Sequence, residues 1–227
     1  MVASRATPSS KYFKCLMFYL IIETSGEDSF VALCEQDKVL NVFFLPEKEQ
    51  SRALFPALEK LLTETRLKQG KIEAIGVGQG PGSFTGTRIG VMAAKALGFA
   101  RKIPLIPFCS LERFVPQALG SFALVSDAHS HGIYLLEGRK EEKGASFRGE
   151  VRLVKPDDIA AAVEKMPTLI CPHPERIGKK WAKAKQAPSV IPAEVNLSFV
   201  AQKVAAKAKR GEAVASQEVR VLYLYAP

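Results

Sequence analysis

The chain has 227 residues, enough for one large domain or two small ones with substantial hydrophobic cores. Its hydrophobic content of 47% and charged content of 24% are typical of a globular protein, and no apolar stretch is long enough to span a membrane. The formal net charge of +9 is a weak indication of an acidic partner such as nucleic acid.

Cysteine and histidine usage favours a reducing compartment and argues against a metal site. The four cysteines are scattered without a C-x-x-C pair, which argues against a zinc site and a disulfide framework and predicts a cytoplasmic protein. They are Cys15, Cys34, Cys109 and Cys171. The pair His129 and His131 and the distant His173 are interpreted as solvated loop residues, with a metal site as the less favoured alternative.

The first half of the chain predicts strands followed by a helix. The apolar run Phe18–Ile22 predicts a buried strand, and residues 1–16 before it are interpreted as a disordered tail or a mis-assigned start. Two further strands and a helix are expected at Phe30–Cys34, Val39–Leu45 and about Lys48–Leu67. Pro56 should kink this helix or mark its first turn.

A glycine-rich stretch, Gly78–Gly90, reads G-Q-G-P-G-S-F-T-G-T-R-I-G and follows the predicted strand Ile72–Val77. Strand–glycine loop–helix units often present free backbone N–H groups to an anion, and Ser83 or Thr85 would cap the helix. The stretch lacks the lysine of a P-loop and the third glycine of a dinucleotide fingerprint. A tight turn that lets strand and helix pack closely is an equally good interpretation.

The helix after this loop carries a ridge of very small side chains at every fourth position: Gly86, Gly90, Ala94 and Gly98. Apolar residues cover much of the remaining circumference, which indicates a helix buried on more than one side. We expect one side to face its own sheet and the ridge to admit a partner helix at close range. The alternative is that both sides are covered within the chain.

The second half predicts another unit of strands and helices. In chain order it contains a strand at Leu105–Phe108, a helix from Leu111, strands at Phe122–Ser126, Gly132–Glu137 and Phe147–Val154, a helix from Lys155, a strand at Thr168–Cys171, a helix at Asn196–Arg210 and a last strand at Val219–Tyr225. This pattern predicts an α/β protein with two lobes, each a mixed sheet with flanking helices.

The glycine stretch, together with I-I-E-T-S near the start, resembles the TsaB family, the non-catalytic partner of TsaD in bacterial tRNA threonylcarbamoyladenosine synthesis. The resemblance covers about residues 17–226. It implies a two-lobed actin-like (ribonuclease H-like) fold. The N-terminal lobe would span residues 17–109 and the C-terminal lobe residues 110–227, with residues 219–227 packing back on the first lobe.

The resemblance also implies where a site would lie. Actin-like ATPases hold Mg²⁺ with strand-end acids, for which Glu23 and Asp127 are the candidates here, although TsaB relatives usually have Asp in place of Glu23. The alternative interpretation is structural: acidic residues at strand ends are also good turn formers. Ser110 and Phe114 stand where TsaD has two metal-binding histidines, so we expect no metal and no catalytic residues. The weak candidates for nucleotide contacts are Glu23, Thr24, Gly80, Gly82, Ser83 and Asp127.

The implied partners are a TsaD-like enzyme in a heterodimer, a TsaE-like ATPase and tRNA bound through the complex, with a homodimer as an alternative state. The isolated chain is expected to hold no cofactor, and ATP or ADP would sit at the partner interface. That interface is predicted to comprise Leu54, Leu58, Gly86, Arg88, Ile89, Gly90, Ala93, Ala94 and Leu97.

Two other functions remain open from the sequence. One is an independent actin-like kinase or peptidase, and the other is a basic RNA-binding module, for which no aromatic stacking platform is evident. The ending Tyr223-Leu224-Tyr225 departs from the family's usual Tyr-Leu-Arg, so an arginine contact at that point is not expected.

Overall fold

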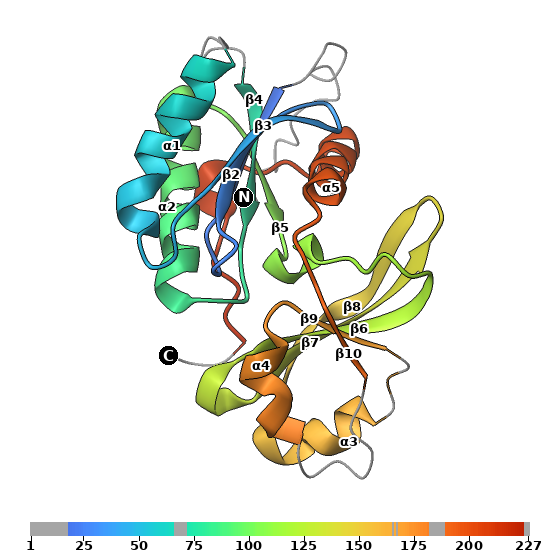
Figure 1. Cartoon of the computed structure of the whole chain (residues 1–227). Helices are drawn as coiled ribbons and strands as arrows, with labels where there is room; N and C mark the ends of the chain where they lie inside the picture. The colour runs from blue at the N-terminus through green and yellow to red at the C-terminus, as the bar shows by residue number, and fades with distance from the viewer. Residues whose placement is uncertain (1–17, 66–71, 165, 167, 182–188, 225–227) are drawn as a thin grey trace, which may run out of the picture.

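Each half of the chain builds a five-stranded mixed sheet, and the two sheets form the cores of two lobes (Figure 1). The computed structural model describes residues 18–65, 72–164, 166, 168–181 and 189–224. The predicted tail at residues 1–16 and Tyr225, the last residue of the predicted final strand, lie outside the described residues. Within the described part of the chain, no helix is both long enough and apolar enough to cross a membrane.

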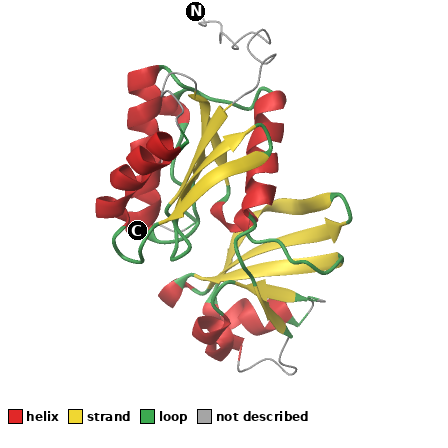
Figure 2. Cartoon of the chain, turned by 45° about the horizontal axis from the view of Figure 1, so that its top comes forward, coloured by secondary structure: helices red, strands yellow, loops and turns green. Residues whose placement is uncertain are grey.

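The first sheet has the spatial order β3 (Lys38–Phe44), β2 (Phe30–Glu35), β1 (Phe18–Glu23), β4 (Ile72–Gly78) and β5 (Leu105–Phe108). β1, β2 and β3 pair antiparallel, whereas β4 is parallel to both β1 and β5. The central strands are apolar and buried on both faces because helices cover each face (Figure 2).

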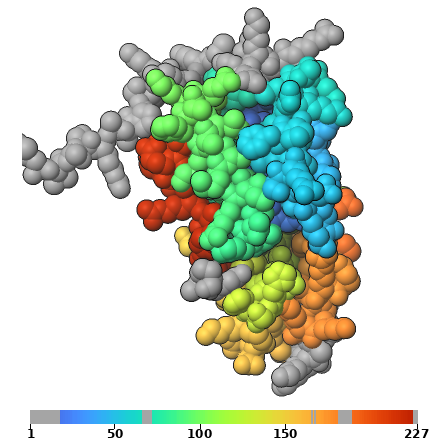
Figure 3. Space-filling view, turned by 90° about the vertical axis from the view of Figure 1, so that its left-hand side faces the viewer, coloured from blue at the N-terminus to red at the C-terminus, as the bar shows by residue number. Residues whose placement is uncertain are grey.

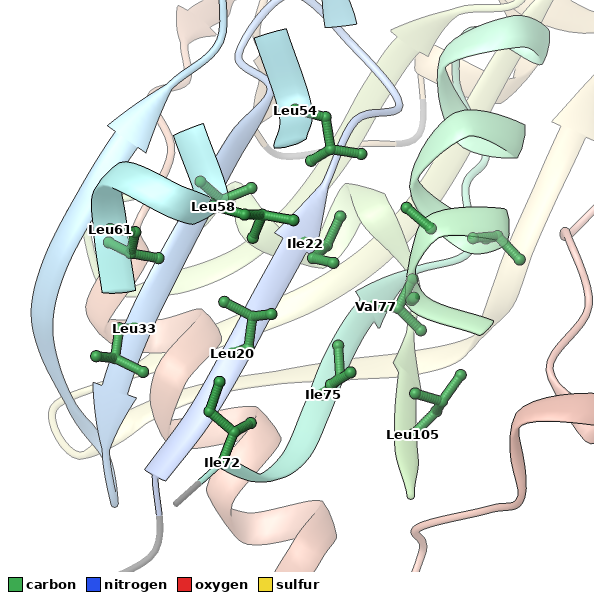
Figure 4. Packing of buried hydrophobic residues seen from close by; sticks show 14 of the residues in the cluster. Leu20, Ile22, Leu33, Leu54, Leu58, Leu61, Ile72, Ile75, Val77 and Leu105 are labelled. Carbon is green, nitrogen blue, oxygen red and sulfur yellow. The ribbon is translucent and has the colours of Figure 1, made fainter. Parts of the chain in front are cut away.

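Two helices cover one face of this sheet: α1 (Gln50–Glu64) and α2 (Phe84–Arg101). Leu54, Leu58 and Leu61 of α1 point onto the leucines and isoleucines of β1 and β2 (Figure 4). On the other face α5 (Leu197–Lys209) buries Val200 and Val204 against a second apolar cluster. The lobe is therefore a three-layer α/β/α unit.

The second sheet repeats the same order, with β8 (Gly144–Val154), β7 (Ile133–Glu141), β6 (Gly120–Asp127), β9 (Leu169–Cys171) and β10 (Val190–Pro192). Its pairing also repeats the first sheet, antiparallel for β6–β7–β8 and parallel for β6–β9–β10. The short helices α3 (Ile159–Val163) and α4 (Pro174–Ile177) cover one face. The predicted two-lobed α/β fold of the actin-like type is confirmed.

Three predicted elements differ from the structure. The helix expected from Leu111 is a single 3₁₀ turn, Ser110–Arg113, because Pro116 disfavours helical backbone at the residue before it. Of the two roles predicted for Pro56, the first turn is wrong because the residue lies inside α1, and the kink stays a prediction. Described residues 219–224 form no strand: their backbone makes isolated hydrogen bonds, such as Leu222 N–H to Gln79 O at 2.8 Å, instead of a ladder.

The lobe boundary also differs from the prediction, which assigned residues 110–227 to the C-terminal lobe and expected only residues 219–227 to pack back on the first. After β10 the chain returns to the first lobe, where α5 covers the sheet and Val219 enters the core beside α2. Leu222 and Leu224 then pack against the core of the second lobe. An amphipathic helix pattern shows that one face is buried but not which sheet buries it, so the sequence could not assign α5 to a lobe.

The N-terminal cap of α2 is Ser83, whose Oγ accepts a hydrogen bond from Gly86 N–H at 3.2 Å. Replacing Ser83 by alanine should lower the free energy of unfolding by about 1 kcal/mol, since one orphan amide loses its partner. Thermal melting would show a decrease of about 2–4 °C. The matched control is Thr85→Ala, at the neighbouring exposed position that the sequence left as the alternative cap; an equal loss there would contradict the assignment.

Candidate functional site

The ridge of very small side chains on α2 packs at its N-terminal end, through Gly86 and Gly90, directly against the residue that follows β1. A methyl group built on Gly86 would lie 2.2 Å from the backbone oxygen of Thr24, and one on Gly90 would lie 2.2 Å from Thr24 Oγ1. Thr24 Oγ1 donates a hydrogen bond to Gly86 O at 2.7 Å. Only glycine permits this approach, so these two glycines serve close packing of helix and strand.

The two glycines before the helix pack against the same strand end. A methyl group on Gly78 would lie 1.8 Å from Glu23 Oε2, and one on Gly82 would lie 2.2 Å from Ser25 O. Glycines at four-residue intervals from Gly78 to Gly90 thus accommodate the segment Glu23-Thr24-Ser25. The two sequence motifs that carry the family resemblance are partners in one packing interaction.

Backbone amides of the glycine loop are engaged within the protein. Gly80 N–H donates to Ser110 Oγ at 2.9 Å, and Ser83 N–H donates to Ser25 O at 2.6 Å. The Gly86 amide is used by the helix cap. These three amides already donate to protein oxygens, which, with the close approach of Gly78 and Gly82 to the strand end, favours the tight-turn interpretation of the loop.

Glu23 lies in the interior, completely buried, beside the almost fully buried Arg113. Arg113 Nη1 lies 3.7 Å from Glu23 Oε1 and donates to Ser110 O at 2.7 Å and to Ser25 Oγ at 3.1 Å. Glu23 Oε1 accepts from Ser25 N–H at 2.7 Å. The carboxylate therefore holds the strand end and the 3₁₀ turn together, and it does not line the cleft between the lobes.

Asp127, the other candidate acid, ends β6 and does line this cleft. Its Oδ1 accepts a hydrogen bond of 2.5 Å from Lys180 Nζ, which also donates to His129 O at 2.5 Å and Gly132 O at 2.8 Å. The turn after β6 thus directs the carbonyl oxygens of His129 and Gly132 at the ammonium group of Lys180. Such a turn disfavours a phosphate, and the two acids are not brought together as a metal-holding pair.

The cleft between the lobes has a volume of about 640 Å³. Of the six weak candidates for nucleotide contacts, Gly82, Ser83 and Asp127 line it, whereas Glu23, Thr24 and Gly80 do not. Its described walls carry three acidic and three permanently cationic side chains: Glu27, Glu47, Asp127, Lys48, Arg113 and Arg176. Because the wall charges balance, three loop amides are already hydrogen-bonded and the turn after β6 is occupied by Lys180, these residues do not form the usual site for Mg²⁺ and a nucleotide.

The positions corresponding to the metal-binding histidines of TsaD are both in the core. Ser110 is fully buried with its Oγ used by Gly80, and the Phe114 ring is buried among apolar side chains. Burial raises the pKa of the Cys34, Cys109 and Cys171 thiols to about 12, so these thiols stay protonated and are poor nucleophiles. Among the described residues, no three histidine, cysteine or acidic side chains cluster as a metal site.

Most of the predicted partner interface belongs to the core of its own lobe. The residues buried there are Leu54, Leu58, Gly86, Gly90, Ala93 and Ala94, and Ile89 and Leu97 are half-buried against them. The six buried residues are covered by the chain itself and present no free surface, whereas Ile89 and Leu97 stay partly exposed; a contact with a partner at this helix remains a prediction. Arg88 is exposed.

The outer face of α2 is instead formed by apolar residues that the sequence reasoning did not single out. Met92 is 62% exposed and Phe99 79%, and Phe84 lies at the start of the same helix, 37% exposed. Figure 3 shows α1 and α2 side by side on this surface, with the segment after α5 along the other edge of α2. The spacing of Arg88, Met92 and Phe99 along one helix side is the signal that could have identified this face.

The chain's end adds an aromatic contact to this face. The Arg88 guanidinium lies 3.6 Å from the centre of the Phe84 ring, and Arg88 Nε donates to Tyr223 Oη at 2.6 Å. The Phe84 and Tyr223 rings are 5.6 Å apart. We call Phe84, Arg88, Met92, Phe99 and Tyr223 the outer α2 surface.

Comparison with known proteins identifies the family. The family model described as TsaD, tRNA N6-adenosine threonylcarbamoyltransferase, matches residues 44–222. The "tRNA threonylcarbamoyladenosine biosynthesis protein TsaB" of Haemophilus influenzae is 25% identical over 175 residues, 74% of each chain. The protein of the same name from Escherichia coli is 29% identical over 156 residues, 66% of this chain and 68% of its own. The chain belongs to the family of this TsaD model, in its TsaB (YeaZ) group.

Solved structures of TsaB-group proteins show the same fold. YeaZ from Pseudomonas aeruginosa superposes with a TM-score of 0.77 at 21% identity, over 92% of this chain and 100% of its own. The described two-lobed fold is therefore shared with this solved structure. The resemblance inferred from the motifs is confirmed by these comparisons.

Proposed function

We propose that this chain is the scaffold and activating subunit of a tRNA threonylcarbamoyladenosine synthesis complex, in which it forms a heterodimer with a TsaD-like enzyme. In this role it supports transfer of a threonylcarbamoyl group to the adenosine beside the anticodon of ANN-decoding tRNAs. The shared name of the TsaB relatives supports a role in this biosynthesis. The chemistry belongs to the partner, because Ser110 and Phe114 offer no metal ligand of the kind that the enzyme has.

The observation that carries the heterodimer is the outer α2 surface. Exposed Met92 and Phe99, with Phe84 and Tyr223 nearby, form an apolar stripe of the kind that marks protein–protein contacts. Its charged neighbours on α2 are Arg88, Lys95 and Arg101, and the helix contains no acidic residue. This surface fits a partner that offers an apolar helix face flanked by acidic side chains.

Replacing Met92 or Phe99 by aspartate should weaken binding to the TsaD-like subunit at least about tenfold, since each charge would be buried in an apolar contact. Titration calorimetry with the purified partner measures the change, and circular dichroism should show an unchanged fold because both side chains are exposed. Leu119→Asp is the matched control: this leucine is 62% exposed but lies in the connection before β6. Wild-type affinity in both α2 variants would place the partner elsewhere.

The remaining partners are part of the same proposal. A TsaE-like ATPase and tRNA join through the heterodimer, and ATP or ADP binds at the interface with the partner, because the cleft residues of this chain do not fit a nucleotide. A homodimer through the outer α2 surface is the alternative state of the isolated chain. Sedimentation of the chain alone, with the partner, and with partner plus tRNA separates these assemblies.

A further inference from the structure

One acidic side chain of the first lobe reaches an arginine and a histidine of the second. Glu27 lies in the turn between β1 and β2, whereas His173 and Arg176 belong to α4 and the residue before it. Glu27 Oε1 forms an ion pair with Arg176 Nη1, and Glu27 Oε2 lies 3.8 Å from His173 Nε2. All three residues line the same cleft between the lobes.

We propose that Glu27 is an interlobe latch, whose carboxylate binds Arg176 and His173 and keeps the cleft closed. The lobes are also joined where the chain crosses between them, by a bridge between Phe114 and Val195 and a 2.8 Å hydrogen bond from Asn196 N–H to Arg113 O. These crossing segments form the hinge. The Glu27 contacts lie at the cleft, where attraction between opposite charges resists opening.

The turn that carries Glu27 is held in place by contacts of its neighbour Gly26 with Ser29, Gln50 and Arg113. Gly26 O accepts hydrogen bonds from Ser29 Oγ and, at 3.4 Å, from Gln50 Nε2. A methyl group built on Gly26 would lie 2.7 Å from Arg113 Nη2, so the turn rests on the buried Glu23–Arg113 pair. These contacts fix the backbone from which the Glu27 side chain extends to α4, so ordering the pair costs side-chain entropy but little backbone entropy.

The latch gives the chain a fixed arrangement of lobes, which suits a subunit that presents constant surfaces to partners. It predicts that loss of Glu27, which removes both contacts, opens the cleft at least as far as loss of Arg176, which leaves His173 beside Glu27. In Glu27→Gln and Arg176→Gln, amide exchange in residues 24–29 and 172–177 should become about two- to fivefold faster, as expected for an ion pair of this kind. The double variant should exchange no faster than Glu27→Gln alone.

Hydrogen exchange on the full chain tests this, with small-angle scattering as a second measurement of lobe separation. Glu137→Gln is the matched control, because it breaks the 3.1 Å pair with Arg152 inside the second lobe. The charge-reversed double variant, Glu27→Arg with Arg176→Glu, should restore slow exchange and the wild-type radius of gyration. Unchanged exchange in the single variants, additive effects, or faster exchange without a larger radius of gyration would each overturn the latch.

Discussion

Replacing Gly90 by leucine is expected to destabilise the isolated chain, before any partner is added. Even a methyl group at this position would lie 2.2 Å from Thr24 Oγ1 and 3.4 Å from Ile22 Cγ2. Overpacking of this kind costs about 1–3 kcal/mol or more, and the hydrogen bond from Thr24 to Gly86 would also be displaced. Thermal melting should fall by about 2–12 °C on the usual scale for a chain of this size.

Gly90→Ala is the more discriminating variant. On helix propensity alone, alanine in the middle of a helix should stabilise by about 0.5–1 kcal/mol relative to glycine. The contact with Thr24 predicts the opposite sign, a loss of stability. Ala96→Leu, on the exposed side of the same helix, is the control and should leave the melting temperature unchanged. A Gly90→Ala variant that melts higher than wild type would show that the strand end yields to the added methyl group.

The glycine ridge shows how far the sequence determines the site. The four-residue spacing correctly indicates that small side chains form one line along α2. It does not determine what approaches that line, because a partner helix and the protein's own strand both need small residues. The helix cap, by contrast, could be predicted from the sequence, because the bond between Ser83 and Gly86 joins residues within one turn.

The same limit explains the other differences. α5 is amphipathic in the sequence, but its partner is the sheet formed by β1 to β5, far away along the chain. Glu23 and Asp127 both end strands as predicted, yet one points into the core and the other meets Lys180. Strand ends follow from apolar runs and turn residues, whereas side-chain partners depend on packing between distant segments.

Removing the guanidinium of Arg113 is expected to cost more stability than the substitutions at Ser83 and Gly90. Arg113→Met fills a similar volume but leaves Glu23 fully buried without its cationic partner. Breaking a buried ion pair from one side costs about 3–5 kcal/mol, because the remaining charge is uncompensated. The variant also loses the hydrogen bonds from Arg113 to Ser110 O and Ser25 Oγ. Denaturant unfolding should show this loss, unless the variant fails to fold at all.

Two further variants separate the charge effect from lost packing. Combining Arg113→Met with Glu23→Leu removes both charges and should recover most of the stability, since an apolar pair of similar volume is often as stable as a buried ion pair. Arg152→Met makes the same substitution at an exposed pair with Glu137 and should cost no more than about 1 kcal/mol. If the double variant were as unstable as Arg113→Met, the guanidinium would act through its bonds to the 3₁₀ turn and strand end. Glu23 would then contribute to the fold through Ser25 N–H rather than through its charge.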